Sequence, residues 1–591
     1  MPSSARPPAS ARPTLRHVAG AILLACLAAP ARGIDLAVDQ IQELDPPARV
    51  PVDSLGFSDK LLPLWLEALD RADAEPRRLA IDTITLAARR GMEGLGEAVP
   101  KLEGVLVDDP DPLARRAAAG ALVALDASAS APRLAAASDR DGTLVAALVE
   151  PALARWDHAP RRDGWLSALD GPAGAERLLA IEALGVVREP RAAAALERIL
   201  LDRDAAPSDR LAAARALGTI RDDGLVAVAT PLAGAAGSGP ASLPRLLAVA
   251  LLARQSGDAA TALLGTLARD PEPAVATGAL ARLDALDAPK ALDVARDSLA
   301  VPDAGQRLLA ARLAIRPGDA DAVDRLAPLL GDRNPSLRRF VAGTFADLAA
   351  DPALRERVLA RATDALGGDQ WRALEQAALL VGHLDHEPAA DRLLALLDSP
   401  RDEVGVAAAW ALRKLEVEAT LAPLLERATD LRGKLAVDEP LPDRARLGLQ
   451  AQQIHQLFGI LRYRPADALL RQYVPKAPID ANARSAAFWA LGLLHENEPD
   501  CDLAPAFAER LADVASVPPE WMQVRWMSAV GIGRMKAASQ LDTLRQFAAR
   551  DTMFNQSGIA SYWAIERITG EPMPPEPVSV RRVGGWFLEP P

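Results

Sequence analysis

The sequence predicts an all-α fold, an α-solenoid in which a helical hairpin is repeated about fifteen times. Half of the residues are apolar but only 4% are aromatic, which is typical of closely packed helices and not of large sheets. The length of 591 residues exceeds what one hydrophobic core serves. A pattern Arg-x-x-Ala-x-x-Ala-Leu recurs along the chain, so a repeat array accounts for that length.

Residues 1–33 have a composition of their own. Three arginines precede an apolar run over residues 18–29, and small residues around Ala31 follow it. This order is typical of a secretory signal peptide, and the run is too short to span a bilayer. We therefore expect an extracytoplasmic protein, periplasmic or secreted. Residues 23–26 also loosely resemble a lipoprotein box, so a lipid anchor at Cys26 is the alternative to simple cleavage.

Removal of this signal peptide takes away four arginines and no acids, which leaves 63 basic residues against 79 acidic ones. The resulting net charge of −16 repels phosphate backbones, so we expect no nucleic-acid partner. Cys501 is then the one remaining cysteine, so no intrachain disulfide forms and the fold depends on packing. Residues 34–59 carry prolines and acids without a helical period, and we expect them to lead into the first repeat.

The repeats are predicted to occupy residues 60–570, and each period has room for two helices and their turns. Asp111-Pro112 and Asn334-Pro335 place a capping side chain before a proline at the first helical position. The hydrophobic residue that ends each copy of the pattern marks the second helix of its hairpin. These residues are Ile84, Leu122, Leu153, Leu184, Leu217, Leu252, Leu280, Ala314, Phe345, Leu379, Leu412, Phe458, Leu491, Ile532 and Ile565.

The arginine of the pattern lies seven residues before that hydrophobic residue and so returns to the same helix face. A charge on a packed face needs a partner, either within the repeat or in the next repeat. Asp204 before Arg210 and Asp332 before Arg338 are candidate partners. We predict a structural, non-catalytic ladder formed by Arg115, Arg177, Arg210, Arg245, Arg338, Arg484 and Arg525.

The copies Ala183-Leu184-Gly185 and Ala216-Leu217-Gly218 resemble the second-helix signature of HEAT repeats, particularly the short bacterial kind similar to those in bilin lyases. The resemblance covers residues 60–570. It implies a superhelix whose second helices line the concave side and which is used chiefly for contact with other proteins. It says little about activity.

Tryptophan is the most informative residue type in the second helices. Trp410, Trp489 and Trp563 each lie two residues before the terminal hydrophobic residue, about 160° from it around the helix. This register predicts solvent-facing rings, and Phe488 and Tyr562 widen the patch. Exposed aromatic side chains commonly anchor a peptide or stack on a sugar ring, so these five are the predicted partner-binding residues. The alternative is that the rings fill gaps between neighbouring helices.

Two histidine-containing clusters are the candidate metal ligands, and both lie in turns. One contains His383, Asp385, His386 and Glu387, and the other contains His495, Glu496, Glu498, Asp500 and Cys501. Neither has a convincing tetrahedral spacing, so we expect no metal and no cofactor. The sequence also lacks the motifs of a serine hydrolase, a phosphate-binding loop or a zinc protease.

The last segment, residues 571–591, is rich in proline and is expected to be extended. Its Trp586 and Phe587 are expected to cap the last repeat, with a docking motif as the alternative.

The sequence therefore favours an exported, non-catalytic scaffold that binds a protein or peptide along the concave face. An enzyme resembling the bilin lyases, acting on a bulky ligand, is one alternative. A carbohydrate-binding module that uses the tryptophan row is another.

Overall fold

The structure is a computed structural model. It describes residues 37–46, 54–57, 60–235, 237, 242–436, 444–477, 479–550, 555–574 and 580–582. The predicted signal peptide, Cys26 and the pair Trp586 and Phe587 lie outside these residues. Two compact units divide the chain: the first holds Leu55–Leu313, and the second holds Ala314–Val580 together with the earlier stretch Ala31–Ser54.

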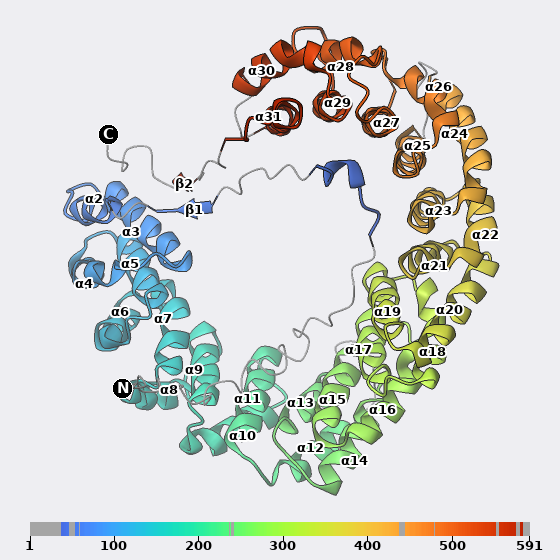
Figure 1. Ribbon diagram of the computed structural model, residues 1–591. Helices are drawn as coiled ribbons and strands as arrows, with labels where there is room; N and C mark the ends of the chain where they lie inside the picture. Colours follow the sequence, from blue (N-terminus) through green and yellow to red (C-terminus); the bar gives the residue numbers. More distant parts are fainter. Residues whose placement is uncertain are drawn as a thin grey trace, which may run out of the picture. The chain divides into compact units, whose positions relative to one another are not determined.

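Helices make up almost all of the first unit (Figure 1). As far as the division between the units they are α2 (Leu61–Ala68), α3 (Ala74–Arg89), α4 (Val99–Asp108), α5 (Pro112–Ala124), α6 (Ala131–Asp141), α7 (Thr143–Arg155), α8 (Arg162–Ala168), α9 (Ala175–Val186), α10 (Ala193–Leu201), α11 (Pro207–Ile220), α12 (Leu225–Ala233), α13 (Leu243–Leu251), α14 (Asp258–Leu267), α15 (Pro273–Leu286), α16 (Ala288–Asp297) and α17 (Ala304–Ala314).

The second unit continues the same alternation. Its helices are α18 (Ala320–Leu326), α19 (Pro335–Leu348), α20 (Pro352–Gly367), α21 (Trp371–His383), α22 (Ala390–Leu396), α23 (Asp402–Leu415), α24 (Leu421–Leu435), α25 (Arg444–Ile460), α26 (Asp467–Leu470), α27 (Ala481–Leu494), α28 (Leu503–Ala512), α29 (Met522–Met535), α30 (Leu541–Arg550) and α31 (Gln556–Thr569).

Short elements complete the described chain. The strands are β1 (Ser54–Gly56) and β2 (Val580–Arg582). The 3-10 helices are η1 (Ile41–Glu43), η2 (Leu95–Ala98), η3 (Ser128–Ser130), η4 (Ala159–Arg161), η5 (Pro190–Ala192), η7 (Ser298–Ala300), η8 (Ala327–Gly331), η9 (Glu387–Ala389), η10 (Glu418–Thr420), η11 (Arg464–Ala466), η12 (Arg471–Tyr473) and η13 (Ala538–Gln540). No helix within the described ranges is long and apolar enough to cross a membrane.

Consecutive helices pair into hairpins, and α2 to α31 give fifteen of them in the described part of the chain. The odd-numbered member of each hairpin carries the hydrophobic residue predicted for the second helix, with Leu252 capping α13, and all of these residues are buried. In the second unit the odd-numbered helices α21 to α31 form the inner, concave layer and the even-numbered helices form the outer layer (Figure 1). The predicted α-solenoid is confirmed.

The predicted helix starts are also present. The Asp111 side chain accepts a hydrogen bond from the Leu113 amide at 3.0 Å, and the Asn334 side chain accepts one from the Ser336 amide at 2.9 Å. Each cap satisfies an amide that the first helical turn leaves without a partner.

The motif arginines bind across repeat boundaries. Arg484 and its partner Glu520 are both fully buried, with hydrogen bonds of 2.6 and 2.9 Å between them. The same guanidinium donates to the carbonyl oxygen of Tyr473 at 3.1 Å, at the end of the preceding first helix. Acids of the next repeat pair in the same way with Arg115, Arg177 and Arg245, through Asp141, Asp209 and Asp270 respectively.

The partners proposed within the repeat are different in the structure. Arg210 donates to the carbonyl oxygen of Leu200 at 3.0 Å, not to the Asp204 carboxylate. Arg338 binds the carbonyl oxygen of Asp332 at 2.9 Å, while Glu375 lies 3.6 Å away across the repeat boundary. Arg525 donates to the carbonyl oxygen of Leu511 at 2.9 Å. Each of these guanidiniums reaches back to a main-chain carbonyl oxygen at or just after the end of the preceding helix.

Candidate functional site

The clearest site in the second unit is the place where residues 37–46, here called the N-terminal segment, lie on the concave layer. The 3-10 helix η1 within this segment lies beside α25 and α27 (Figure 1). The side chains that hydrogen bond to the segment come from four consecutive second helices, and we call them the receiving face. They are Trp410, Arg413, Gln453, Gln456, Trp489 and Arg534.

One end of the segment is held at Asp39. Its carboxylate accepts a hydrogen bond from Nε1 of Trp410 at 2.8 Å and pairs with the Arg413 guanidinium. Its main-chain carbonyl oxygen accepts a hydrogen bond from Nε2 of Gln453 at 3.0 Å. Because Gln453 also accepts from Nε of Arg413 at 2.8 Å, these side chains form one connected network.

The other end is held at Asp45 in a similar way. The carbonyl oxygen of Asp45 accepts from Nε1 of Trp489 at 2.9 Å, and its carboxylate pairs with Arg534 at 2.6 Å. The Arg534 guanidinium also lies over the Trp489 ring, 5.2 Å from its centroid. Between the two ends, the side-chain amide of Gln456 donates to the side chain of Gln42.

The receiving face carries a buried positive charge at each of its two ends. The side chains of Arg413 and Arg534 are 3% and 5% exposed, whereas those of Asp39 and Asp45 are 42% and 48% exposed. Burial lowers the pKa of both guanidiniums, and the carboxylates opposite them oppose that shift. The face therefore needs anionic partners.

The predicted exposure of the aromatic row is wrong for its first members. Trp410 is 4% exposed, Trp489 is 1% exposed, and only Trp563 is half-buried. Each of these rings packs against a glycine of the preceding second helix, so that a Cβ built on Gly382, Gly459 or Gly533 would lie 2.9 to 3.0 Å from the ring. The helical angle placed the rings away from the hairpin core, but the neighbouring second helix and the N-terminal segment cover that side.

The two other predicted aromatic residues behave differently. Phe488 is fully buried and packs against Phe507 of the outer-layer helix α28, with ring centroids 4.4 Å apart, so it belongs to the core between the layers. Tyr562 is half-buried on α31. The structure thus brings Trp410 and Trp489 to one bound segment and leaves Phe488 out of it.

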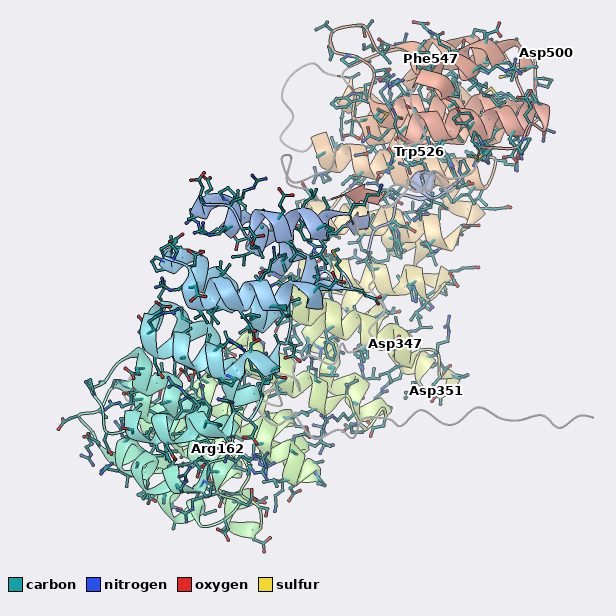
Figure 2. All side chains as sticks on the ribbon, turned by 90° about the vertical axis from the view of Figure 1, so that its left-hand side faces the viewer. Arg162, Asp347, Asp351, Asp500, Trp526 and Phe547 are labelled. Atoms are coloured by element: carbon teal, nitrogen blue, oxygen red, sulfur yellow. The ribbon has the colours of Figure 1, made fainter. Side chains whose placement is uncertain are left out.

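Three of the five residues in the second histidine cluster come together. His495, Glu498 and Cys501 offer ligand atoms within 4.8 Å of one another, whereas Asp500 is exposed at the margin of the last repeats (Figure 2). The two ring nitrogens of His495 already face carboxylates, Glu498 at 2.5 Å and Asp467 at 2.6 Å.

The charges around this cluster do not suit a metal ion or a nucleophile. Arg464 pairs with Glu498 at 2.7 Å, and Arg471 pairs with Asp467 at 2.7 Å, so each carboxylate already has a cation. Burial raises the pKa of the Cys501 thiol above its ordinary value of 9.0, so the thiol stays protonated at neutral pH. The arrangement is a closed network of ion pairs.

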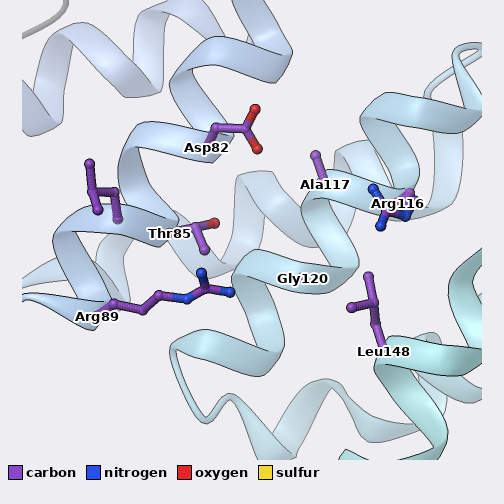
Figure 3. Close-up of a pocket in the computed structure, with 8 residues that line it drawn as sticks. Asp82, Thr85, Arg89, Arg116, Ala117, Gly120 and Leu148 are labelled. Carbon is purple, nitrogen blue, oxygen red and sulfur yellow. The ribbon is translucent and has the colours of Figure 1, made fainter.

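The first unit has a cavity of about 330 Å³ on its second helices α3, α5 and α7 (Figure 3). Asp82 and Arg89 line one side, Arg116 lines the other, and all three side chains are exposed. A cavity whose charged groups are all solvated offers no desolvated group to bind a ligand strongly.

The sequence analysis did not identify the polar part of the receiving face. Arg413 and Arg534 do not belong to the repeated pattern, and Asp39 and Asp45 lie in a stretch without helical period. One signal was present: α25 carries four glutamines over residues 450–456, and Gln453 and Gln456 are among them. Amides buried on a helix surface need hydrogen-bond partners, so such a run indicates a polar contact.

No protein-family model and no curated protein matches the chain. Among solved structures, importin beta crystallised from ammonium sulfate is 16% identical, with a TM-score of 0.46 over 86% of this chain and 72% of that one. A Kap95–Nup1 complex is 13% identical, with a TM-score of 0.43 over 86% and 72% of the two chains. These low scores add no argument about function, and the assignment of the fold depends on the helices described above.

Proposed function

We propose that this protein is an exported, non-catalytic scaffold that binds a protein or peptide segment on the concave layer of its second unit. The observation that carries the proposal is the N-terminal segment itself, a short stretch of chain with the 3-10 helix η1 at its centre, held on that layer. Gln453 and Trp489 donate to its main-chain carbonyl oxygens, which any peptide possesses. Hydrogen bonds to main-chain carbonyl oxygens do not depend on the side chains of the bound segment, so this face recognises the peptide main chain itself.

Trp563 offers room for a partner beyond the segment. It repeats the packing of Trp410 and Trp489, with its ring against Gly533 and Arg567 at 5.6 Å from its centroid. It is half-buried, and its ring nitrogen is not among those that donate to the N-terminal segment. The tryptophan row therefore continues past the place where the segment ends.

The alternative functions have less support from the geometry. A carbohydrate module needs exposed ring faces, but Trp410 and Trp489 are buried. For an enzyme resembling the bilin lyases, Cys501 is a poor nucleophile, since burial raises the pKa of its thiol and keeps it protonated at neutral pH.

The test is site-specific photo-cross-linking in the native host, with benzoylphenylalanine in place of Trp563. The matched control places the same group at Glu426, an exposed residue of the outer-layer helix α24. We expect Trp563 to give an adduct with another protein and Glu426 to give none. Equal adducts from both positions, or none from Trp563, would refute a protein partner on the concave layer beside Trp563. The mass of the mature native protein tests export, because cleavage near residue 33 is expected.

A further inference from the structure

The side chains of the receiving face are more deeply buried than those of the N-terminal segment. The arginines of the face are almost fully buried, but roughly half of each aspartate side chain remains exposed. Leu44, in the same segment, is 63% exposed. The face is held in place by helix packing, whereas the segment lies on its surface with part of its side chains in solvent.

The segment also leaves hydrogen-bonding capacity of the face unused. Nη1 of Arg534 and Oε1 of Gln456 are buried and have no hydrogen-bond partner, although both side chains contact the segment through their other atoms. A buried polar atom without a partner destabilises the state in which the segment is bound. A ligand with an additional acceptor near Arg534 would therefore bind this face better than the resident segment does.

We propose that the receiving face is the binding site for a short acidic segment of a partner protein, and that residues 37–46 are a resident competitor for the same site. This inference deepens the proposed function and depends on it. The partner segment carries two carboxylates spaced as Asp39 and Asp45 are, one for Arg413 and one for Arg534. Its main chain accepts hydrogen bonds from Gln453 and Trp489, and between the carboxylates an acceptor side chain takes the place of Gln42 opposite Gln456.

Attachment to the same chain gives the resident segment an advantage over any partner. An intramolecular ligand acts at an effective concentration on the order of millimolar, so it weakens binding in trans until it is released. Substitution of Asp39 and Asp45 removes the two charged contacts of the resident segment and leaves the face intact. The site should then become available to an added peptide.

The experiment measures fluorescence anisotropy of a labelled peptide with the sequence of residues 37–46, titrated with the full-length chain. We compare the wild type, the variant D39N/D45N and the charge-matched control D398N/D430N. Asp398 and Asp430 are exposed acids that pair with Arg427, away from the receiving face. We expect D39N/D45N to bind the peptide at least tenfold more tightly than the wild type, and the control to bind as the wild type does.

Two further arms test the chemistry. Arg534→Gln in the D39N/D45N background should reverse the gain at least tenfold, with circular dichroism as the check of folding. A peptide in which both aspartates are replaced by asparagine should bind every variant at least tenfold more weakly, and this arm does not depend on the folding of a variant. Equal affinity of D39N/D45N and the wild type, or equal affinity of the acidic and asparagine peptides, overturns the inference.

Failure of this inference and failure of the proposed function give different results. If Trp563 cross-links to a partner but D39N/D45N gains no affinity for the peptide, the proposed scaffold function is supported. The inference that its ligand is an acidic segment is then refuted. If the peptide behaves as expected but no adduct forms at Trp563, the receiving face binds acidic segments. The proposed protein partner beside Trp563 is then refuted.

Discussion

Arg484 shows what a single residue of the repeated pattern contributes. The sequence predicted an arginine on a packed face that needs a partner within its repeat or in the next one, and the two candidate acids, Asp204 and Asp332, each lie six residues before their arginine. The structure instead pairs Arg484 with Glu520, 36 residues later, and Arg177 with Asp209, 32 residues later. A period of about this length places the acid of the next repeat beside the arginine. The repeat spacing therefore predicts which acid pairs with the arginine, but only once the stacking of neighbouring hairpins is known.

His455 is a residue whose charge state is strongly affected by the fold. It is fully buried on α25, with its Nδ1 3.0 Å from the carbonyl oxygen of Ala483, and burial lowers its pKa to about 4 from an ordinary 6.5. Between these values the unfolded chain binds a proton that the folded chain does not, so stability falls as the pH drops from 6.5 to 4 and levels off below that. This contribution is on the order of 3 kcal/mol.

We therefore expect His455→Gln to flatten the pH dependence of the unfolding free energy between pH 6.5 and 4. The measurement is urea unfolding followed by circular dichroism at several pH values. His158→Gln, at a half-buried position of the first unit, serves as the control and should keep the slope of the wild type. An unchanged slope in His455→Gln would show that another group causes the acid sensitivity.

At the scale of the helix, the tryptophan row depends on glycines of the neighbouring second helix. Helical angles alone placed Trp410 and Trp489 in solvent, because they describe one hairpin and not the stack. In the stack, a Cβ at Gly459 would lie 2.9 Å from both Cα of Ala490 and the Trp489 ring. The second helices α25 and α27 are therefore closer together than any residue larger than glycine would permit.

We expect Gly459→Ala to destabilise the protein by about 1 to 3 kcal/mol, since it adds a methyl group to a packed contact. Gly433→Ala is the matched control, because Gly433 lies in α24 with nothing within 4 Å of the added Cβ. That change should stabilise by up to about 1 kcal/mol through helix propensity. Thermal unfolding monitors both, and equal effects of the two substitutions would contradict the close packing of α25 and α27.

At the scale of the whole molecule, the fifteen hairpins follow from composition, period and capping residues, all of which are local properties of the sequence. The receiving face could not be predicted in the same way. It joins Asp39 to Arg413 and Asp45 to Arg534, across 374 and 489 residues, and no periodic signal connects such positions. The five predicted aromatic residues included two members of the face, Trp410 and Trp489, but its charges were missed.

In an array in which each hairpin contacts its neighbours, a destabilising substitution should lower the stability of the nearby hairpins and not of distant ones. Arg484→Ala removes one partner of a buried pair, a loss of about 3 to 5 kcal/mol, and leaves Glu520 without its cation. We expect hydrogen exchange measured by mass spectrometry to accelerate in α26 to α29 and to stay unchanged in α18 to α21 of the same unit. Uniform acceleration through the unit would contradict this local response.

The position of the N-terminal segment has a consequence for the order of events during synthesis. Residues 37–46 leave the ribosome before any helix of the array, whereas Arg534 lies 489 residues after its partner Asp45. Contacts between neighbouring hairpins form over short stretches of chain and are fast, but this contact must wait until α29 has been made and folded. A newly made molecule therefore presents its acidic segment without a complete binding site until α29 is in place.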